Sequence, residues 1–395
     1  MNKLLFARIH GRLTAALWDG TRFLQLDAEE EEPSILGNIY IAKVKNVVKN
    51  INSAFVDLGG GRMAYYSLQD GPCHFAGDTR RSVPQAGDDL VVQVVREAVK
   101  TKDPVVSGKL SFTGRFCVLT AGRNQIGFSS KIRDAGRRRQ LQALLEPEME
   151  EDFGVIVRTN AQDAPEERIL EELRFLKEQY RQVLAASWFR VSGSLLYEAE
   201  PFCRARLRDV YGQDLEAIVT DQPDVYDDLR EYLSRHQPEA LPLLRLYQDP
   251  LVSLDKVYQL EKALDEALSP RVWLKSGGYL VIEPTEALTV IDVNTGKYAG
   301  KKNQQETIKK INLEAARETA RQLRLRNLSG IILVDFIDME TAKDQEELLS
   351  VLSACCFQDP IKTTVVDMTR LNLVELTRKK VRKPLYEQIG RRRQK

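Results

Sequence analysis

Histidine and the cysteine patterns that bind metals are scarce in this chain of 395 residues. It contains three histidines, His10, His74 and His236, and its five cysteines include no C-x-x-C pair. Zinc-dependent hydrolysis and acid–base catalysis by paired histidines both need several nitrogen or sulfur groups. Any catalysis by this chain is therefore expected to rely on carboxylates and a hard cation.

Long apolar runs are also missing. No stretch of about 18 apolar residues exists, so no membrane-spanning segment is predicted. The N-terminal segment MNKLLFARIHGRL has a short apolar patch interrupted by Arg8 and His10, which predicts a first strand and not a signal peptide. With no export signal, the scattered cysteines are expected to be reduced thiols of a cytoplasmic protein.

Charge is balanced overall but unevenly distributed. The formal net charge is +1, whereas residues 370–395 carry ten basic residues opposed only by Glu375 and Glu387. This basic segment is either a solvated surface or a contact for phosphate groups. The length predicts two to four domains, and the hydrophobic content of 43% is ordinary for a globular protein.

Short strands separated by glycine-rich turns follow one another between residues 38 and 99. Residues 38–48, 53–61, 63–68 and 88–99 have the strand pattern, which predicts a small antiparallel barrel. Three aromatic residues, Phe55, Tyr65 and Tyr66, lie on these strands, and Lys43, Lys45 and Lys102 are nearby in sequence. They are either core aromatics with ordinary surface lysines, or a surface that stacks bases and contacts phosphates.

The middle of the chain alternates strands and helices. Strands are predicted at 114–120 and 153–159, on either side of a basic helical stretch at 130–145. Apolar residues at three- and four-residue steps predict a helix over 165–187. Further helices are predicted at 225–235 and 254–268, with proline-containing breaks between them.

The last third contains the residues that indicate chemistry. A hairpin at 277–296, a helix at about 304–326 and a strand at 331–338 form a βαβ-like unit. Asp292 and Asp335 close its two strands, and Asn294 points to the same side as Asp292. Each aspartate alone could cap a turn. Together the oxygen ligands favour a magnesium ion, which would relieve the repulsion between two carboxylates.

Several long motifs resemble the bacterial ribonuclease E/G family, in a short form. Three motifs resemble the catalytic region of that family: VIDVNTG (290–296), NLEAARETARQLRLRNLSGIILVDFIDM (312–339) and ELTRKK (375–380). Two further motifs resemble the family's RNA-binding and sensor regions, in the same order: NIYIAKVKNVVKNINSAFVDLGGG (38–61) and GVIVRTNA (154–161). The resemblance extends over the chain up to about residue 385.

This resemblance implies roles for individual residues. Asp292 and Asp335 would bind magnesium, and Asn294 would orient a catalytic carboxylate or the substrate. Single-stranded RNA would contact Phe55, Tyr65 and Lys102. The pocket for a 5′-monophosphate would be formed by Gly114, Val118, Arg158, Thr159 and Lys362. Lys362 stands where an arginine is expected, so it keeps the charge but not the planar fork.

The resemblance also implies an α/β multi-domain architecture. It consists of an RNase H-like domain with an inserted S1-like OB-fold barrel and a 5′ sensor, followed by a DNase I-like catalytic domain. The expected boundaries are 1–34 and 205–267 for the degenerate RNase H-like domain, 35–108 for the S1-like OB-fold domain, 109–204 for the sensor, 268–390 for the catalytic domain and 391–395 for a basic tail.

The implied function is a magnesium-dependent endoribonuclease, with Mn²⁺ able to substitute. It would cleave single-stranded RNA, preferentially when 5′-monophosphorylated, to 5′-phosphate and 3′-hydroxyl products in RNA processing and mRNA decay. The alternatives are a non-catalytic protein that binds single-stranded RNA and, less favoured, a DNA nuclease. The family's C-P-x-C zinc link is missing after Cys356. Zinc and a zinc-linked dimer are therefore not expected, and a monomer or weak homo-oligomer is.

Overall fold

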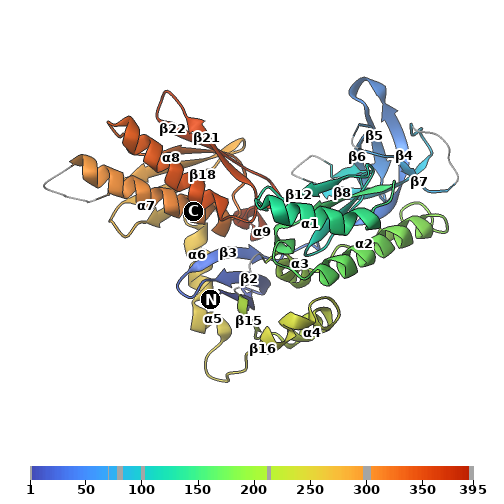
Figure 1. Ribbon diagram of the computed structural model, residues 1–395, viewed down its shortest axis with the longest axis horizontal. Helices are drawn as coiled ribbons and strands as arrows, with labels where there is room; N and C mark the ends of the chain where they lie inside the picture. Colours follow the sequence, from blue (N-terminus) through green and yellow to red (C-terminus); the bar gives the residue numbers. More distant parts are fainter. Residues whose placement is uncertain are drawn as a thin grey trace. The chain divides into compact units, whose positions relative to one another are not determined.

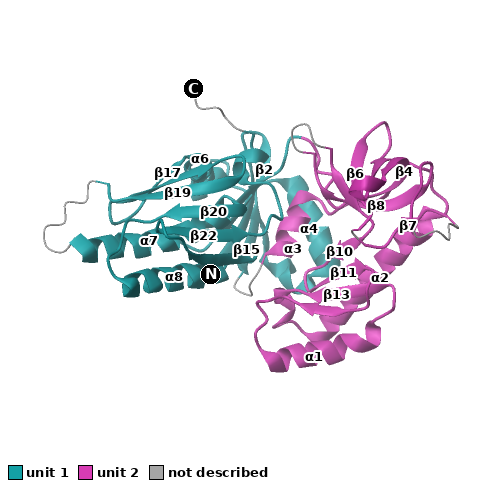
Figure 2. Cartoon of the chain, turned by 90° about the horizontal axis from the view of Figure 1, so that it is seen from above, with its two compact units in different colours: residues 1–31, 213–395 teal, residues 32–212 magenta. Residues whose placement is uncertain are grey.

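The computed structural model describes residues 2–69, 71–77, 83–98, 103–210, 215–296 and 304–390. Lys102 and the basic tail 391–395, both named above, lie outside this part of the chain. The chain divides into two compact units, one made of Met1–Glu31 and Gln213–Lys395 and the other of Glu32–Gly212 (Figure 2). Short 3-10 helices lie at Lys49–Ile51, Glu146–Glu148, Thr159–Ala161 and Pro238–Leu243.

A closed five-stranded barrel forms the first part of unit 2. Its strands run in the order β4-β5-β6-β9-β8, and β8 pairs with β4 to close it. The bounds are β4 (Ile39–Val48), β5 (Ser53–Asp57), β6 (Met63–Ser67), β8 (Asp89–Arg96) and β9 (Val105–Ser107), with β7 (His74–Phe75) and β14 (Leu195–Tyr197) added at the sides. The barrel predicted from the alternating pattern is confirmed, and it is OB-like.

A four-stranded sheet with two long helices forms the second part of unit 2. The sheet has the order β10-β11-β13-β12. Its elements are β10 (Ser111–Thr113), β11 (Cys117–Ala121), β12 (Ile126–Phe128), β13 (Phe153–Val157), α1 (Ala135–Leu145), α2 (Glu166–Ser187) and α3 (Phe202–Asp209). The predicted apolar stripe of α2 is buried: Ile169, Leu173, Leu176, Tyr180 and Val183 belong to the core of this part.

The N-terminal strand of unit 1 pairs with a strand far along the chain. β1 runs parallel to β15, with Leu5 opposite Val219, in a sheet of order β16-β15-β1-β2-β3. The elements are β1 (Asn2–Ile9), β2 (Arg12–Trp18), β3 (Phe23–Ala28), β15 (Leu215–Thr220), β16 (Leu244–Leu246), α4 (Pro223–His236), α5 (Leu254–Tyr258), α6 (Leu260–Leu268) and α9 (Leu385–Gln388).

One helix predicted in unit 1 is interrupted in the structure. The expected helix 254–268 is divided into α5 and α6 at Gln259, whose backbone has φ 54°. This left-handed conformation is unusual for a residue other than glycine and cannot continue a right-handed helix. The carboxylate of Asp255 accepts a hydrogen bond from the backbone N–H of Glu261 at 2.7 Å and so spans the break.

A six-stranded sheet, here called the C-terminal sheet, forms the rest of unit 1. Its order is β17-β18-β19-β20-β22-β21, and α7 and α8 lie along one of its faces (Figures 1 and 2). The elements are β17 (Arg271–Trp273), β18 (Tyr279–Pro284), β19 (Leu288–Asn294), β20 (Gly330–Asp335), β21 (Thr363–Met368), β22 (Leu373–Arg378), α7 (Gln304–Leu325) and α8 (Ala342–Phe357). Strands β19 and β20 are parallel neighbours, which confirms the predicted βαβ unit.

A buried ion pair fixes the edge of this sheet. Arg378 is 3% exposed and donates to the Asp359 carboxylate at 2.7 Å. The same guanidinium donates to Asn327 Oδ1 at 2.8 Å and to the carbonyl of Leu328 at 3.0 Å. Since Leu328 comes just before β20, this pair fixes the start of the strand that ends at Asp335.

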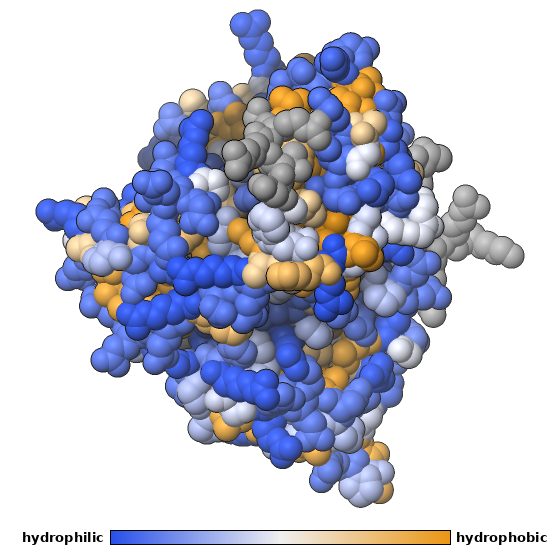
Figure 3. All heavy atoms as spheres, turned by 90° about the vertical axis from the view of Figure 1, so that its right-hand side faces the viewer, coloured by the Kyte–Doolittle hydropathy of each residue, from blue (hydrophilic) through white to orange (hydrophobic). Residues whose placement is uncertain are grey.

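The surface is mostly hydrophilic on the face drawn in Figure 3, where hydrophobic residues lie in separate patches. Among the residues that the structure describes, no helix is both long and apolar enough to cross a membrane.

Candidate active site

Asp292 and Asp335 lie directly opposite each other on neighbouring parallel strands. The register of β19 and β20 pairs these two residues at the end of the ladder. Paired residues of neighbouring strands point to the same face, and the strands are about 4.8 Å apart. Both side chains are exposed, on the face opposite to the buried Ile291 and Val334. We call Asp292 and Asp335 the carboxylate pair, and this side of the C-terminal sheet the open face.

Asn294 belongs to the same face, two residues after Asp292. Its Nδ2 donates a hydrogen bond to Asp292 Oδ2 at 2.6 Å. The amide therefore restrains the orientation of the carboxylate and leaves its other oxygen for a ligand. The sequence placed these three polar groups at one strand end, and the structure brings all three together.

The carboxylate pair concentrates negative charge on the open face. The pKa of Asp335 is raised above its usual value, first by burial and then by the negative charges of Asp292 and Asp338. Asp338 is itself bound by Asn372 Nδ2 at 2.8 Å. Within the described ranges, no lysine or arginine forms an ion pair with either member of the pair.

These residues fit a magnesium ion. Magnesium prefers oxygen ligands, is commonly held by one or two carboxylates, and keeps several waters or substrate oxygens in its shell. The described part of the chain contains no group of three or more histidine, cysteine or acidic residues suited to a metal. Two carboxylates at the end of a sheet would leave most coordination positions to water and substrate.

Asn312 supports the carboxylate pair and was missed from the sequence. This residue of α7 is fully buried, and its Nδ2 donates to the carbonyl of Ile337 at 2.7 Å. Its Oδ1 accepts from the N–H of Ile337 at 3.1 Å, which fixes the loop that follows Asp335. A polar residue beside Ile311 within the apolar stripe of the predicted helix was the available signal.

Phe55 and Tyr65 lie side by side on the outside of the barrel. They are register partners on β5 and β6, and their ring centroids are 6.1 Å apart in an edge-to-face arrangement. Both rings are half-buried, whereas Tyr66, one residue further on, points into the barrel and is 2% exposed. The Tyr65 hydroxyl is hydrogen-bonded to Ser53 Oγ. The structure thus places Phe55 and Tyr65 on the outside of the barrel and Tyr66 in its core.

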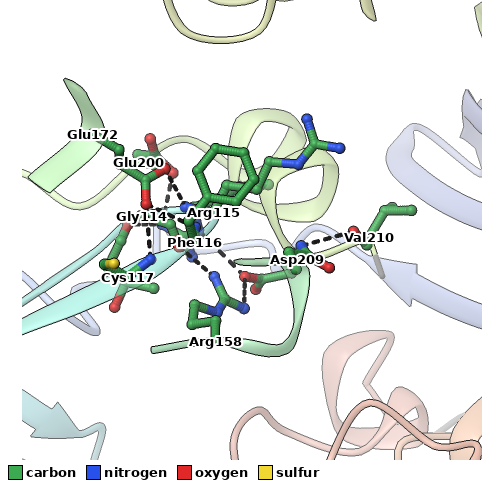
Figure 4. Close-up of polar contacts among 12 residues, drawn as sticks. Gly114, Arg115, Phe116, Cys117, Arg158, Glu172, Glu200, Asp209 and Val210 are labelled. Atoms are coloured by element: carbon green, nitrogen blue, oxygen red, sulfur yellow. Dashed lines mark hydrogen bonds and ion pairs between the residues drawn. The ribbon is translucent and has the colours of Figure 1, made fainter. Parts of the chain in front are cut away.

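Four of the five proposed sensor residues lie in or next to the four-stranded sheet of unit 2, and Figure 4 labels two of them, Gly114 and Arg158. The Arg158 guanidinium donates to the carbonyl of Gly114 and to Asp209 Oδ1, the latter at 2.9 Å. Thr159 Oγ1 is hydrogen-bonded to Ser129 Oγ at 2.9 Å. Val118 pairs with Ile156, two residues before Arg158, and therefore shares a face with Arg158.

Glu172 organises the turn beside Arg158 and was also missed from the sequence. Its carboxylate accepts the backbone N–H groups of Arg115, Phe116 and Cys117 at 2.7–2.8 Å (Figure 4). Burial raises the pKa of Glu172, and these three hydrogen bonds oppose the rise. A Cβ atom at Gly114 would lie 2.3 Å from Glu172 Oε1, so the turn requires glycine there.

Lys362 belongs to the other compact unit, between α8 and β21. Its side chain is exposed, and its carbonyl accepts a hydrogen bond from the N–H of Lys379 at 3.0 Å. The contacts of Gly114, Arg158 and Thr159 described above are all made within unit 2.

The chain is similar to known ribonucleases over most of its length. The model of the "Ribonuclease E/G family" matches residues 111–381. Ribonuclease G of Haemophilus influenzae is 37% identical over 362 residues, which cover 89% of this chain and 74% of that protein. Ribonuclease G of Escherichia coli K12 is 32% identical over 381 residues, 93% of this chain and 77% of that protein.

Ribonuclease E of Synechocystis sp. is 36% identical over 366 residues, but the chain spans only 54% of the length of that protein. The carboxylate pair, the barrel and the sheet around Arg158 thus occur in a chain whose relatives are nucleases acting on RNA. The chain belongs to the ribonuclease E/G family, and the resemblance inferred from its motifs is confirmed.

Proposed function

We propose that this chain, an endoribonuclease by its family, hydrolyses phosphodiester bonds within single-stranded RNA with a magnesium ion bound by Asp292 and Asp335. The observation that carries the proposal is the pairing of these two acids on neighbouring parallel strands. Two exposed carboxylates with a raised pKa on one of them form a site that a divalent cation would stabilise.

The residues around the pair have distinct tasks in this proposal. Asp292 and Asp335 hold the cation, and Asn294 orients Asp292 through their 2.6 Å hydrogen bond. When bound, magnesium supplies a Lewis acid that polarises the scissile phosphate and lowers the pKa of a water molecule. The products are a 5′-phosphate fragment and a 3′-hydroxyl fragment, and manganese would replace magnesium because it accepts the same oxygen ligands.

The barrel would bind the single strand on its aromatic side. Phe55 and Tyr65 offer two outward rings, and unstacked bases can stack on aromatic rings without regard to sequence. Lys102 would contact a phosphate, as the family resemblance implies. Exposed bases occur in single strands and not in duplexes, so this surface supports the preference for single-stranded RNA.

The sheet around Arg158 would recognise a 5′-monophosphate. Arg158 and Thr159 supply a planar cation and a hydroxyl, which suit a terminal phosphate. Gly114 and Val118 would line the pocket. Because Asp209 already binds Arg158 at 2.9 Å, the phosphate has to share or displace this carboxylate. We therefore propose a moderate preference for 5′-monophosphorylated RNA.

The biological setting belongs to the same proposal. An enzyme with these specificities would act in RNA processing and mRNA decay in the cytoplasm. We propose a monomer or weak homo-oligomer without a zinc link between chains. The adjacent residues Cys355 and Cys356 lie within α8. Burial raises the pKa of both thiols and so disfavours the thiolate form that zinc requires.

The test is cleavage of an A/U-rich single-stranded RNA by the purified chain. The 5′-monophosphorylated and 5′-hydroxyl forms are compared in magnesium and in a chelator. We expect cleavage only with magnesium, faster for the monophosphate, and nearly abolished in Asp292→Asn. Glu283→Gln, which removes a different exposed acid from the open face, should cleave normally. Undiminished cleavage by Asp292→Asn would refute the metal site, and equal rates for both RNA ends would refute the sensor.

A further inference from the structure

An arginine and two aromatic residues form a cluster at the edge of the open face. Arg271 and Trp273 lie on the edge strand β17, and Tyr279 lies on β18 opposite Trp273. The Trp273 and Tyr279 ring centroids are 5.2 Å apart, and the Arg271 guanidinium carbon lies 4.7 Å from the Tyr279 ring centroid. The same carbon is 5.8 Å from the Trp273 ring. We call these three residues the arginine–aromatic cluster.

The strand register places this cluster next to the carboxylate pair. Arg271 pairs with Val281, which pairs with Asp292, so all three lie in one cross-strand row on the same face. Trp273 and Tyr279 lie in the neighbouring row, where Tyr279 pairs with Asn294. Arg271 is thus two strand spacings, about 10 Å, from Asp292.

Core packing does not account for the cluster. Trp273 is 65% exposed and Arg271 is exposed, so neither side chain is held inside the fold. The turn that follows β17 is nevertheless fixed from α7. The Glu314 carboxylate accepts the N–H of Lys275 at 2.7 Å and that of Ser276 at 3.1 Å. An exposed tryptophan next to a restrained turn is a rigid surface that is free to contact a ligand.

The chemistry of the cluster matches a nucleotide. Every nucleobase has a π face that can stack on tryptophan or tyrosine, and stacking tolerates any base. An arginine beside the rings adds cation–π attraction and a charge that complements phosphate. A protein surface could also use tryptophan, tyrosine and arginine. The cross-strand row that joins Arg271 to Asp292 favours RNA as the ligand, because the RNA backbone must reach the carboxylate pair to be cleaved.

We propose that the arginine–aromatic cluster stacks on an RNA base close to the scissile phosphate, with Trp273 as the main stacking surface. This inference rests on the proposed function for the position of the scissile bond. Arg271 keeps the rings in place and neutralises a phosphate of the same nucleotide. The cluster thereby holds the strand on the open face while Asp292 and Asp335 bind the cation.

The first experiment measures binding in a chelator, where no cleavage is required. A fluorescent single-stranded RNA is titrated with the wild-type chain, Trp273→Ala, Tyr279→Ala and Trp273→Phe. The loss of one stacked base predicts binding weaker by on the order of 5- to 150-fold for Trp273→Ala, with Trp273→Phe close to wild type. Trp188→Ala is the control, since Trp188 is 58% exposed and lies after α2 in the other unit.

The second experiment locates the base and separates this inference from the proposed function. Abasic nucleotides are placed one at a time on either side of the cleaved bond. One abasic position should weaken binding to the wild type but not weaken it further in Trp273→Ala. With magnesium, Trp273→Ala should raise KM more than it lowers kcat. If the wild type does not cleave but the binding losses occur, the proposed function fails and the cluster still binds RNA.

Three results would overturn the inference. The first is wild-type affinity in both Trp273→Ala and Tyr279→Ala. The second is an equal loss in Trp188→Ala, which would show that any exposed tryptophan contributes. The third is a changed association state of Trp273→Ala in light scattering with unchanged RNA affinity, which would assign the cluster to a protein contact. Circular dichroism of each variant shows whether it is folded.

Discussion

Replacing Asp335 by asparagine should stabilise the metal-free protein while it abolishes cleavage. The substitution keeps the shape of the side chain and removes one of two negative charges at paired strand positions. At a separation of about 5 Å, two unit charges repel by about 0.8 kcal/mol at the dielectric constant of water and about 3 kcal/mol at an effective value of 20. Both side chains are exposed, so a stabilisation of about 1 kcal/mol is expected.

The expected gain depends on pH with a definite sign. The pKa of Asp335 is raised in the folded state, so the folded state binds this proton more tightly than the unfolded state does. The penalty of the charged carboxylate is therefore absent below the ordinary carboxyl pKa and grows as pH rises through the raised value. Asp335→Asn should exceed the wild type in stability at neutral pH, and the two should converge in acid.

Thermal unfolding in a chelator and in magnesium measures both effects. In a chelator, the melting temperature of Asp335→Asn should be higher by about 2–4 °C for each kcal/mol. Magnesium should then stabilise the wild type by mass action and leave the variant unchanged. Glu283→Gln removes a charge from the same face, away from the pair, and controls for net charge. A variant that is less stable in the chelator, or that responds to magnesium like the wild type, would refute the reasoning.

Three further substitutions test other parts of the molecule. Phe55→Ala should weaken RNA binding by about 1–3 kcal/mol, measured by anisotropy, whereas Tyr65→Phe keeps its ring and should bind normally. Glu172→Ala leaves three backbone N–H groups without their acceptor, so the free energy of unfolding in urea should fall by about 1–3 kcal/mol for each group. A total decrease below about 1 kcal/mol would contradict this. Arg378→Ala should lower the free energy of unfolding by about 3–5 kcal/mol, because it leaves the buried Asp359 carboxylate without its ion-pair partner. Replacing Asp359 as well should restore part of this stability.

Local patterns in the sequence were sufficient for the carboxylate pair. Each strand of the βαβ unit is apolar and carries an aspartate at or near its end, and one amphipathic helix separates the two strands. That order allows parallel neighbours, and parallel neighbours that end alike bring their last residues together. The barrel was predictable for a similar reason, because strict alternation assigns each side chain to one of its two faces.

Contacts between distant residues were beyond such patterns. Glu172 binds backbone groups 55 to 57 residues earlier, and no local spacing marks a helical acid as the partner of a distant turn. β1 pairs with β15 across an even longer stretch of the chain, as Leu5 opposite Val219 shows, and this pairing was expected only from the family resemblance. The left-handed Gln259 has no compositional signal, because glutamine is compatible with the continuous helix that was predicted.

The arginine–aromatic cluster was missed for a different reason. β17 has three residues, too few to show alternation, so the face on which Arg271 and Trp273 lie was not predictable from the sequence. Only the register with β18 and β19 shows that they share the open face with Asp292. Short edge strands hide functional side chains in this way, since their neighbours in space determine their orientation.

The open face combines two features that weaken the metal-free fold. It holds two like charges at paired positions, and it leaves large apolar side chains such as Trp273 and Ile331 more than half exposed. A cation would remove the first cost, and stacked bases would cover part of the second. Both features are thus disadvantages for the isolated chain and advantages for a complex with metal and RNA. The opposite face, packed against α7 and α8, supplies the stability that lets the open face remain in this state.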